Sequence, residues 1–317
     1  VVSMCGRPLL PVLNFVNASQ HREQDWRDAL ARLGLHALVC FDSVAPPLDG
    51  ERRLYDSLAL LQEKARPQLQ RLIDDHQAQR LLRRHSGARL IAELLLDCAA
   101  CRRSVAAQSV LEQGAIRELH QTIRQREQRC VEALLRLYAF RQDDAKASDL
   151  PLLDGRWGDD LFNPETLKQL GIKVGGGMAA GAATGVGVDL LVGGITLGAA
   201  AALGALVGGS AQTLRNYGSR LKGKLKGQRE LTVDDAVLRL LALRQHLLLQ
   251  TLEARGHAAV DTITLATPQD ATWREGKLPD ALHKARAHPQ WSSLNPGATL
   301  EDSERQEQVQ QLAAELL

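Results

Sequence analysis

The stretch ARLIAELLLDCAAC, residues 88–101, indicates the fold class of this chain. Its apolar residues recur three and four positions apart, which is the spacing of one face of an α-helix. Two adjoining rows have this spacing: Leu90, Leu94 and Asp97, then Ile91, Leu95 and Cys98. A stripe of that width can pack against two neighbouring helices. We therefore expect an antiparallel helical pair or a small bundle.

The sequence on both sides has the composition of long helices. From Glu51 to Arg141 there is one proline, Pro67, and there are two glycines, Gly87 and Gly114. Proline and glycine are the residues least favourable inside a helix, so their scarcity favours long helices. Aromatic residues make up only 3% of the chain, too few for a typical β-sandwich or β-barrel. The predicted fold class is mainly α.

The overall composition excludes functions that need a strong net charge over the whole surface, such as unspecific binding of nucleic acid. The chain has 317 residues, with 39 Lys and Arg against 37 Asp and Glu, and a formal net charge of +2. Such a balance recruits neither nucleic acid nor an anionic membrane over the whole surface, so contacts of that kind need a local cluster. Irregularly spaced cysteines in a chain of this size point to a reducing compartment. The chain begins with Val1 and lacks the features of a signal peptide, so we interpret it as a fragment that faces the cytosol.

Two groups in the helical region invite a chemical interpretation. Cys98 and Cys101 have CxxC spacing, but there is no second CxxC, so we interpret them as small core residues rather than as a zinc or redox site. The arginine-rich stretches are interpreted as solvated helix faces, with RNA contact as the alternative. Interleaved acids and the lack of stacking aromatics count against RNA. The stretches are Arg83–Arg84, Arg102–Arg103 and Arg124–Arg129.

The first sixty residues have a different pattern. Two short apolar runs, PVLNFV at 11–16 and HALVCF at 36–41, each precede a segment with helical spacing. This β-α-β-α order predicts parallel strands, and two parallel strands do not make a stable sheet by themselves. We expect the rest of the sheet to lie upstream of Val1. The fold class is thus mainly α with a truncated α/β segment.

These runs, with stretches further along the chain, resemble a family of bacterial P-loop GTPases whose C-terminal half is a domain of unknown function, numbered 3482. The matching stretches are PVLNFV, LHALVCFDSVAPPLDGERRLYDSL, VGGGMAAGAATGVGVDLLVGGITLGAAAALGALVGG, ELTVDDAVLRLLALR and RGHAA. The resemblance implies that the chain starts with the C-terminal end of a P-loop GTPase domain and continues with a helical domain. It also implies GTP as the cofactor of the full-length protein, with Mg²⁺ bound by residues outside this chain.

The resemblance further implies where the base of a guanine nucleotide would be recognised. The family's Asn-Lys-x-Asp loop aligns with Asn14, Phe15, Val16 and Asn17, and its Ser-Ala-Lys loop aligns loosely with Ser43, Val44 and Ala45. An Asp accepts two charge-assisted hydrogen bonds from guanine, whereas an Asn also presents a donor. Asn17 therefore predicts weaker guanine selectivity, while Phe15 can cover one face of the base. Without the resemblance, Asn14 is equally well explained as a turn residue after a strand.

The phosphates have no binding loop in this chain. No GxxxxGK[ST] motif occurs in the sequence, and this motif supplies the backbone cradle, the lysine and the Mg²⁺ ligand of P-loop enzymes. We therefore expect the fragment alone not to hydrolyse a nucleotide, and we assign it no catalytic or metal-binding residue.

The run from 174 to 214 is the most unusual part of the sequence. Its 41 residues contain a single ionisable side chain, Asp189, and twelve of the chain's 26 glycines. One helix of this length would span about 60 Å, twice the hydrocarbon core of a bilayer. A turn near Gly193–Gly194 divides the run into arms of 19 and 20 residues, 174–192 and 195–214. We expect a Gly-rich apolar helical hairpin in the membrane; a buried hairpin within a soluble domain and an insertion into one leaflet are the alternatives.

Basic residues flank this run on both sides. Lys168 and Lys173 precede it, and a basic stretch without an acid follows it. Cationic flanks place both ends on the cytosolic side and favour contact with an anionic membrane surface. The expected location is the cytoplasmic side of the bacterial inner membrane, with the cytoplasm as the alternative. The basic stretch comprises Arg215, Arg220, Lys222, Lys224, Lys226 and Arg229.

The C-terminal third predicts two helices and a connecting loop. The first helix is expected from an N-cap at Thr232 to a C-terminal cap at Gly256. The stretch 268–296 has loop composition, in which Trp273 and Trp291 are the expected docking anchors. A last helix is expected over 299–317.

These features predict five consecutive parts: residues 1–63 of the α/β domain, a helical domain at 64–150, a linker at 151–173, the hairpin at 174–214, and a basic stretch with a mostly helical cap at 215–317. The predicted function is that of the C-terminal portion of a membrane-associated GTP-binding protein whose nucleotide state is coupled to the helical and membrane regions. The alternative is a non-catalytic scaffold for a membrane or RNA partner, with a degenerate GTPase domain. A homo-oligomer is left open, and nucleic acid is not expected as a partner.

Overall fold

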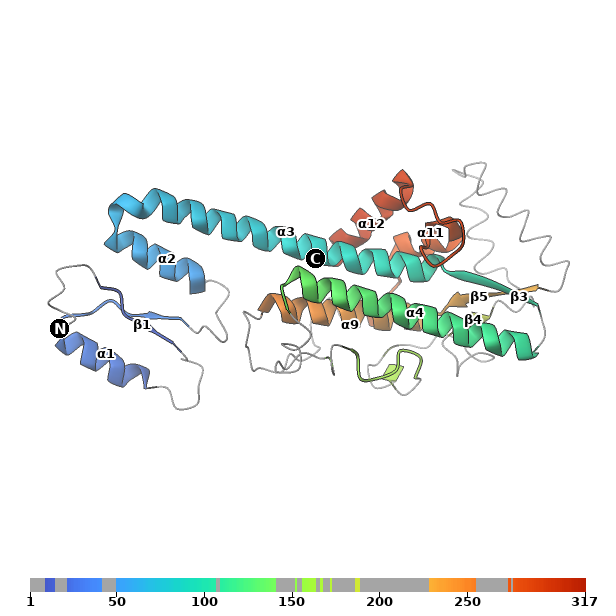
Figure 1. Cartoon of the computed structure of the whole chain (residues 1–317), viewed down its shortest axis with the longest axis horizontal. Coiled ribbons are helices and arrows are strands. Elements are labelled where there is room, and N and C mark those ends of the chain that lie inside the picture. The colour runs from blue at the N-terminus through green and yellow to red at the C-terminus, as the bar shows by residue number, and fades with distance from the viewer. Residues whose placement is uncertain are drawn as a thin grey trace. The chain divides into compact units, whose positions relative to one another are not determined.

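The fold is described from a computed structural model, drawn in Figure 1. It describes residues 9–14, 22–41, 50–106, 109–140, 152, 156–163, 166–167, 172, 186–188, 228–254, 273–274 and 276–317. Over these residues the chain is mainly helical, as expected, and it contains two small sheets.

Contacts divide the chain into two compact units, each assembled from non-adjacent ranges. Unit 1 comprises Val1–Ser86, Leu135–Asp154 and Leu249–Ile263, and unit 2 comprises Gly87–Leu134, Gly155–Leu248 and Thr264–Leu317. The sequence predicted consecutive domains instead. The two descriptions differ because three long helices contribute residues to both units.

Unit 1 contains the expected β-α-β-α arrangement. Its elements are β1 (Val12–Leu13), α1 (Glu23–Arg32), β2 (Val39–Cys40) and α2 (Gly50–Leu61). The strands pair in parallel, with Val12 opposite Val39 and Leu13 opposite Cys40. Gly34 has a φ of +76° just after α1, a conformation that glycine adopts without strain and that commonly follows the end of a helix.

The second helix of this unit folds back on the start of the third. A short 3₁₀ turn, η2 (Glu63–Ala65), joins α2 to α3 (Arg66–Ala100). His76 of α3 lies 3.0 Å from Glu51 of α2 through Nδ1 and Oε2, and its ring meets that of Tyr55 edge to face at 5.9 Å. These contacts make α2 and α3 an antiparallel helical hairpin.

Unit 2 is built on a bundle of α3, α4 (Ser109–Leu137) and α9 (Asp235–Ala254), which run side by side in Figure 1. The helices α3 and α4 are antiparallel: the Cys130 thiol lies 3.6 Å from the Leu90 carbonyl oxygen, and Arg126 is bonded to Asp97. The expected small bundle is therefore confirmed. Its buried residues include Ile91, Leu94, Leu95, Cys98, Leu119, Ile123, Leu238, Leu241 and Leu248.

A three-stranded antiparallel sheet lies where α3 ends and α4 and α9 begin. It consists of β3 (Arg102–Ala106), β5 (Gln228–Val233) and β4 (Val186–Val188), with β5 in the centre. Two predictions are wrong here. Residues 102–106 were expected to be helical, and 186–188 were expected within the helical arm 174–192. Both segments become strands because they pair with β5.

Most of the glycine-rich run lies outside the described residues. The same holds for the basic stretch, except for the backbone of Arg229 in β5. Within the described part of the chain, no helix has the length and apolar character needed to cross a membrane.

A C-terminal cap completes unit 2. It contains α11 (Asp280–Ala287), the 3₁₀ turn η4 (Pro289–Trp291) and α12 (Ser303–Glu315). Trp291 is fully buried and Trp273 is 7% exposed, so both expected anchors are confirmed. The prediction of a loop over 268–296 is wrong at 280–287, which form the helix α11. The last helix begins at Ser303 rather than Thr299, because the Asp302 carboxylate accepts the first backbone N–H groups.

Candidate functional site

The residues expected to meet a nucleotide base follow β1 and β2. Asn14 comes directly after β1 and is exposed. Phe15, Asn17 and Ser43–Ala45 lie outside the described residues.

Backbone hydrogen bonds show the register of the two strands at this edge. The Phe41 N–H donates to the Leu13 carbonyl at 2.9 Å, and the Val39 N–H donates to the Pro11 carbonyl at 3.1 Å. Since the two strands are parallel, their carboxyl ends share one edge of the sheet, and this is where open α/β sheets bind ligands. The structure therefore places Asn14 at the edge that such a site would use.

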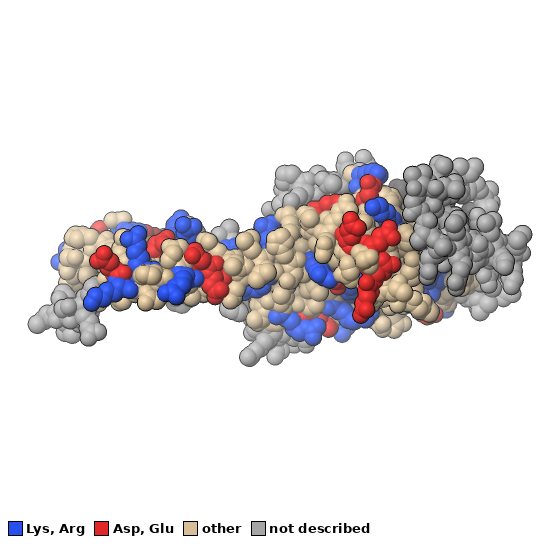
Figure 2. Space-filling model, turned by 90° about the horizontal axis from the view of Figure 1, so that it is seen from above, with Lys and Arg blue, Asp and Glu red and all other residues tan. Residues whose placement is uncertain are grey.

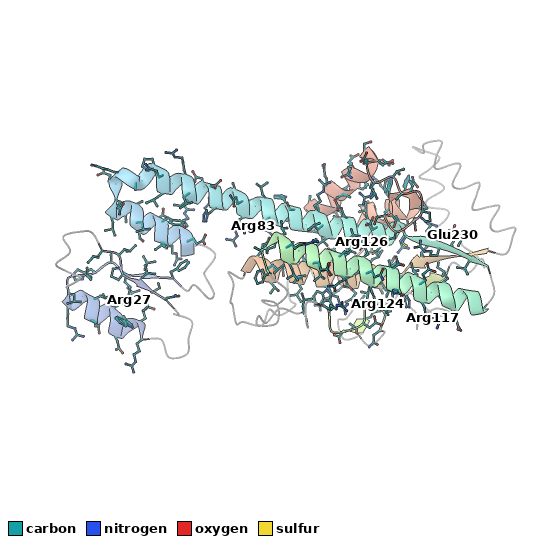
Figure 3. The ribbon with its side chains drawn as sticks, in the orientation of Figure 1. Arg27, Arg83, Arg117, Arg124, Arg126 and Glu230 are labelled. Atoms are coloured by element: carbon teal, nitrogen blue, oxygen red, sulfur yellow. The ribbon has the colours of Figure 1, made fainter. Side chains whose placement is uncertain are left out.

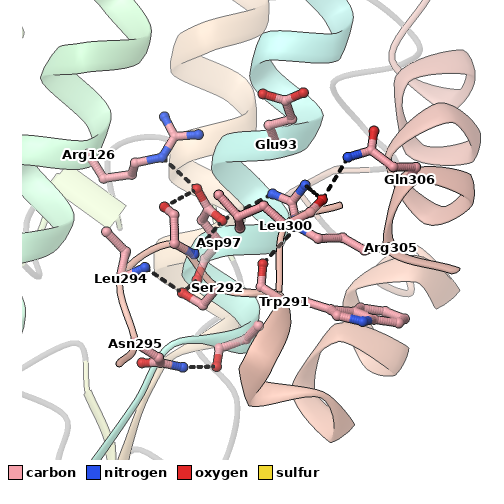
Figure 4. A network of polar contacts seen from close by, with 12 residues as sticks. Glu93, Asp97, Arg126, Trp291, Ser292, Leu294, Asn295, Leu300, Arg305 and Gln306 are labelled. Carbon is pink, nitrogen blue, oxygen red and sulfur yellow. Dashed lines mark hydrogen bonds and ion pairs between the residues drawn. The ribbon is translucent and has the colours of Figure 1, made fainter. Parts of the chain in front are cut away.

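A second arrangement lies in unit 2, where a buried carboxylate gathers partners from three elements (Figure 4). Asp97 of α3 is 2% exposed. Its Oδ2 accepts hydrogen bonds from Arg126 Nε and from the Ser293 hydroxyl, both at 2.7 Å. Its Oδ1 accepts from the Ser293 N–H at 3.0 Å and from Arg305 Nη2 at 3.3 Å. We call Asp97, Arg126, Arg305 and Ser293 the Asp97 cluster.

The Asp97 cluster fastens the cap to the bundle. Arg305 of α12 also donates from Nε to the Trp291 carbonyl at 2.8 Å, and the Ser292 hydroxyl donates to the Asp97 carbonyl at 2.7 Å. Trp291 in turn donates from Nε1 to Asp302 at 3.2 Å. Both oxygens of the Asp97 carboxylate thus accept hydrogen bonds that hold α3, α4 and the cap together.

The sheet is bonded to the cap mainly through Asn295, which contacts the start of β3 and the end of α3. Asn295 accepts on Oδ1 from the Arg102 N–H at 3.1 Å and from Arg103 Nη1 at 3.0 Å, and it donates to the Ala100 carbonyl at 3.0 Å. Arg102 also forms an ion pair with Glu230 of β5 at 2.7 Å.

The interpretation of the arginine stretches as solvated helix faces is wrong for three of their members. Arg102, Arg103 and Arg126 bind acids or carbonyl oxygens inside unit 2. Arg126 and Arg124 both project from α4 (Figure 3), but Arg124 remains partly exposed and pairs with Asp160 at 2.9 Å. The signal for burial was present in the sequence: Asp97 is a lone carboxylate within an apolar stripe, and such a group needs a cation.

The residue after Arg126 on α4 is a second buried carboxylate, Glu127, which is 6% exposed. Gln245 Nε2 donates to its Oε1 at 3.4 Å, and Arg244 Nη1 lies 3.7 Å from the same atom. Burial raises the pKa of Glu127 to about 7, against the opposing effect of Arg244. The sequence carried a signal here too: Glu127 follows Leu119 and Ile123 at intervals of four, on the row of α4 that continues to Cys130 and Leu134.

The two central cysteines behave as expected of core residues. Cys98 and Cys101 are fully buried and carry free thiols. Burial raises the pKa of both, that of Cys101 to about 11, so neither is a reactive thiolate at neutral pH. Among the described residues, no group of three or more His, Cys, Asp and Glu side chains is placed to hold a metal ion.

On the face in Figure 2 basic and acidic side chains are interspersed at the left, and a group of acidic side chains gathers right of the centre. Both signs of charge are thus present on this face of the described residues.

Comparison with known protein families matches residues 27–314, from within α1 to within α12. The chain belongs to the family described as Domain of unknown function (DUF3482). No curated protein and no solved structure matches the chain. The family match spans the bundle, the sheet and the cap, and its description assigns them no activity.

Proposed function

We propose that this chain is the C-terminal portion of a membrane-associated GTP-binding protein whose nucleotide state is coupled to its helical region. The observation that carries the proposal is the parallel β1-α1-β2 unit with Asn14 directly after β1. A two-stranded parallel sheet is incomplete as a folding unit, and its carboxyl edge is where a nucleotide base would lie.

The route of coupling would start at α2. This helix follows β2 along the chain, and it contacts α3 through the pair Glu51–His76 and the rings of Tyr55 and His76. The residues of α3 belong partly to unit 1 and partly to unit 2. If a bound nucleotide displaced α2, the first contacts in α3 to change would therefore be those of His76.

The membrane part of the proposal rests on the sequence of the run 174–214 and of the basic stretch after it. Because Val186–Val188 is a strand of the sheet, the first arm is not one continuous helix. Attraction of the basic stretch to anionic lipid, at about 1 kcal/mol per basic residue near the surface, does not depend on that arm.

The nucleotide proposal is tested by base selectivity. The full-length protein should bind a fluorescent GTP analogue, and GTP and XTP should compete for it with similar strength. Asn17→Asp should favour GTP by about tenfold or more, because a charged acceptor strengthens the bonds to guanine by more than 1 kcal/mol. Asn163→Asp, an exposed Asn in unit 2, is the matched control and should change nothing.

Two results would count against the nucleotide proposal. One is an unchanged GTP to XTP ratio in Asn17→Asp. The other is nucleotide turnover by the purified 317-residue chain, since the phosphate-binding motif is missing from it.

The membrane proposal is tested by flotation with vesicles. The chain should float with vesicles that contain phosphatidylglycerol and not with neutral ones. Changing the basic stretch to glutamine should abolish flotation if attachment is peripheral, and high salt should do the same. Retention after carbonate washing would indicate insertion of the run. A chain that never floats would exclude membrane association.

The alternative is a non-catalytic scaffold with a degenerate GTPase domain. It is supported by Phe15 and Asn17, which differ from the Lys and Asp of the family's base-recognition loop. Its RNA form is weakened by the structure, because Arg102, Arg103 and Arg126 are already engaged within the protein. A full-length protein that binds no nucleotide but still floats with anionic vesicles would favour the scaffold.

A further inference from the structure

The middle of α3 is exposed on every side. Residues 77–86, all in unit 1, are exposed although they lie inside a helix of 35 residues. This part of the helix, which we call the exposed stretch, contains two adjacent leucines, Leu81 and Leu82, which are 57% and 66% exposed. A helix that bridges through solvent is expected to be polar all round. The two leucines therefore point to a surface that binds a partner.

The side chains of the exposed stretch form two rows. The leucine row has the i, i+3, i+4, i+7 spacing of one helix face and comprises Ala78, Leu81, Leu82 and His85. The arginine row lies on the opposite side of the helix and comprises Arg80, Arg83 and Arg84. Arg84 pairs with Glu253 of α9 at 3.6 Å. The arginine row therefore faces the end of α9, and the leucine row faces away from it.

The charge of the exposed stretch is of one sign. No acid occurs between Asp75 and Glu93 in the sequence. Arg83, labelled in Figure 3, donates to the Gln79 carbonyl of its own helix at 3.4 Å, and it has no acidic partner in the described part of the chain. A partner that suits this stretch is therefore both apolar and negatively charged.

Two other partners fit less well. A second copy of this chain, paired through the same stretch, would bring two sets of arginines together without an acid between them, and like charges repel. Single-stranded nucleic acid usually stacks its bases on aromatic side chains, and residues 77–86 contain no Phe, Tyr or Trp. The surface of a bilayer with anionic lipids supplies both the apolar and the negatively charged component.

We propose that the exposed stretch binds an anionic phospholipid surface, with Leu81 and Leu82 inserted between the headgroups. This inference rests on the membrane association proposed above and adds a second contact to it, separate from the basic stretch. A helix with apolar residues on one face and arginines on the other lies in the plane of the interface. The diameter of a helix and the Debye length at 0.1 M salt are both about 10 Å, so the arginine row still attracts the lipid phosphates.

The proposal is tested with a fluorophore that reports its surroundings. The full chain carries Leu81→Cys labelled with nitrobenzoxadiazole, and Cys5→Ser and Cys40→Ser remove two other sites of labelling. The remaining cysteines are buried and should not react: Cys98, Cys101 and Cys130. Vesicles that contain phosphatidylglycerol should shift the emission to the blue and raise it several-fold, and neutral vesicles should not. Leu60→Cys, at a leucine of α2 that is 83% exposed, is the matched control and should give no change.

Flotation of the same samples separates this proposal from the membrane proposal above. A chain that floats with anionic vesicles while the label at position 81 keeps its emission would overturn the binding of the exposed stretch and leave membrane association standing. A chain that does not float would overturn both. A blue shift without vesicles that grows with protein concentration would assign the surface to a second copy instead.

The contribution of the arginine row has its own test. In the labelled chain, Arg83→Gln should raise the concentration of anionic lipid needed for half of the fluorescence change by about fivefold. Arg117→Gln, an exposed arginine on α4 in unit 2, is the matched control and should leave that concentration unchanged. Gln retains the helix propensity of Arg, so both variants should keep the helical content of the wild type. An unchanged value in Arg83→Gln would overturn the choice of an anionic surface.

Discussion

Asp97 is a single negative charge that faces two buried guanidinium groups. Arg126 and Arg305 are 14% and 5% exposed in their side chains, and Asp97 is 2% exposed. Removing one partner of a buried ion pair leaves the others without compensation, and the penalty usually exceeds the value of the pair itself. The carboxylate therefore matters more to stability than its number of hydrogen bonds suggests.

Asp97→Ala should lower the free energy of unfolding by about 3–5 kcal/mol, measured by urea denaturation. The matched control is Asp280→Ala in the same unit, where Asp280 pairs with Lys277 at 2.8 Å but both side chains are more than half exposed. Exposed pairs contribute little, so the control should stay close to the wild type. Equal losses in the two variants would show that removing Asp97 does not leave Arg126 and Arg305 as costly unpaired charges.

Glu127 gives stability a predictable dependence on pH. Its pKa is raised by burial from 4.5 to about 7, so between these values the folded chain holds a proton that the unfolded chain has lost. The contribution of Glu127 is therefore fully present below about pH 4.5 and is lost as the pH rises through about 7. At about 1.4 kcal/mol per pKa unit, it is on the order of 3 kcal/mol.

Urea denaturation at pH 5 and pH 8 measures this dependence. Glu127→Gln should flatten the difference between the two values, whereas Glu118→Gln, an exposed residue on the same helix, should leave it as in the wild type. Asp160 does not interfere, because its lowered pKa confines its effect to more acidic solution. An unaltered pH dependence in Glu127→Gln would assign the effect to another group.

At the scale of elements, the sequence predicts the helices well and the second sheet not at all. The apolar rows of residues 88–101 are sufficient to identify α3, since a repeat of three and four is a local property. In contrast, β3 pairs with β5 across more than a hundred residues of sequence, with Arg102 opposite Thr232. Its pattern RRSVA has no strand signal of its own, so only the partner makes it a strand.

The start of α9 shows how a cap can be misplaced by two residues. Thr232 belongs to β5, and the Asp234 carboxylate accepts the Ala236 N–H at 2.8 Å. Both residues are good N-caps by type, and only the end of the strand at Val233 decides between them.

Asp234→Ala should lower the free energy of unfolding by about 1 kcal/mol through loss of this cap. Thr232→Val retains the β-branched shape in the strand and is the matched control, with a smaller expected loss. Thermal denaturation of both variants measures the difference. A larger loss in Thr232→Val would show that Thr232, and not Asp234, stabilises the start of α9.

At the scale of the whole molecule, the two units differ in how much apolar surface they bury. In unit 1, α1 has no buried residue, and Trp26 and Leu33 are 54% and 58% exposed. In unit 2 the bundle and the cap enclose Trp291 completely. Composition could predict a core of this kind. It could not predict the Asp97 cluster, because Arg305 lies 208 positions from Asp97 in the sequence.

This difference predicts that the units open separately. Trp291→Phe removes the bond to Asp302 and part of the ring at the centre of the cap, which should cost about 1–3 kcal/mol. Because cooperative units lose protection together, hydrogen exchange should quicken by a common factor over the unit 2 parts of α3, α4, α9 and the cap. Exchange in α1 and β2 should stay unchanged, and Trp26→Phe, the exposed counterpart, should leave unit 2 unaffected. A uniform loss of protection in both units after Trp291→Phe would instead mean that the continuous helix α3 transmits unfolding from one unit to the other, and that the chain opens as a single cooperative body.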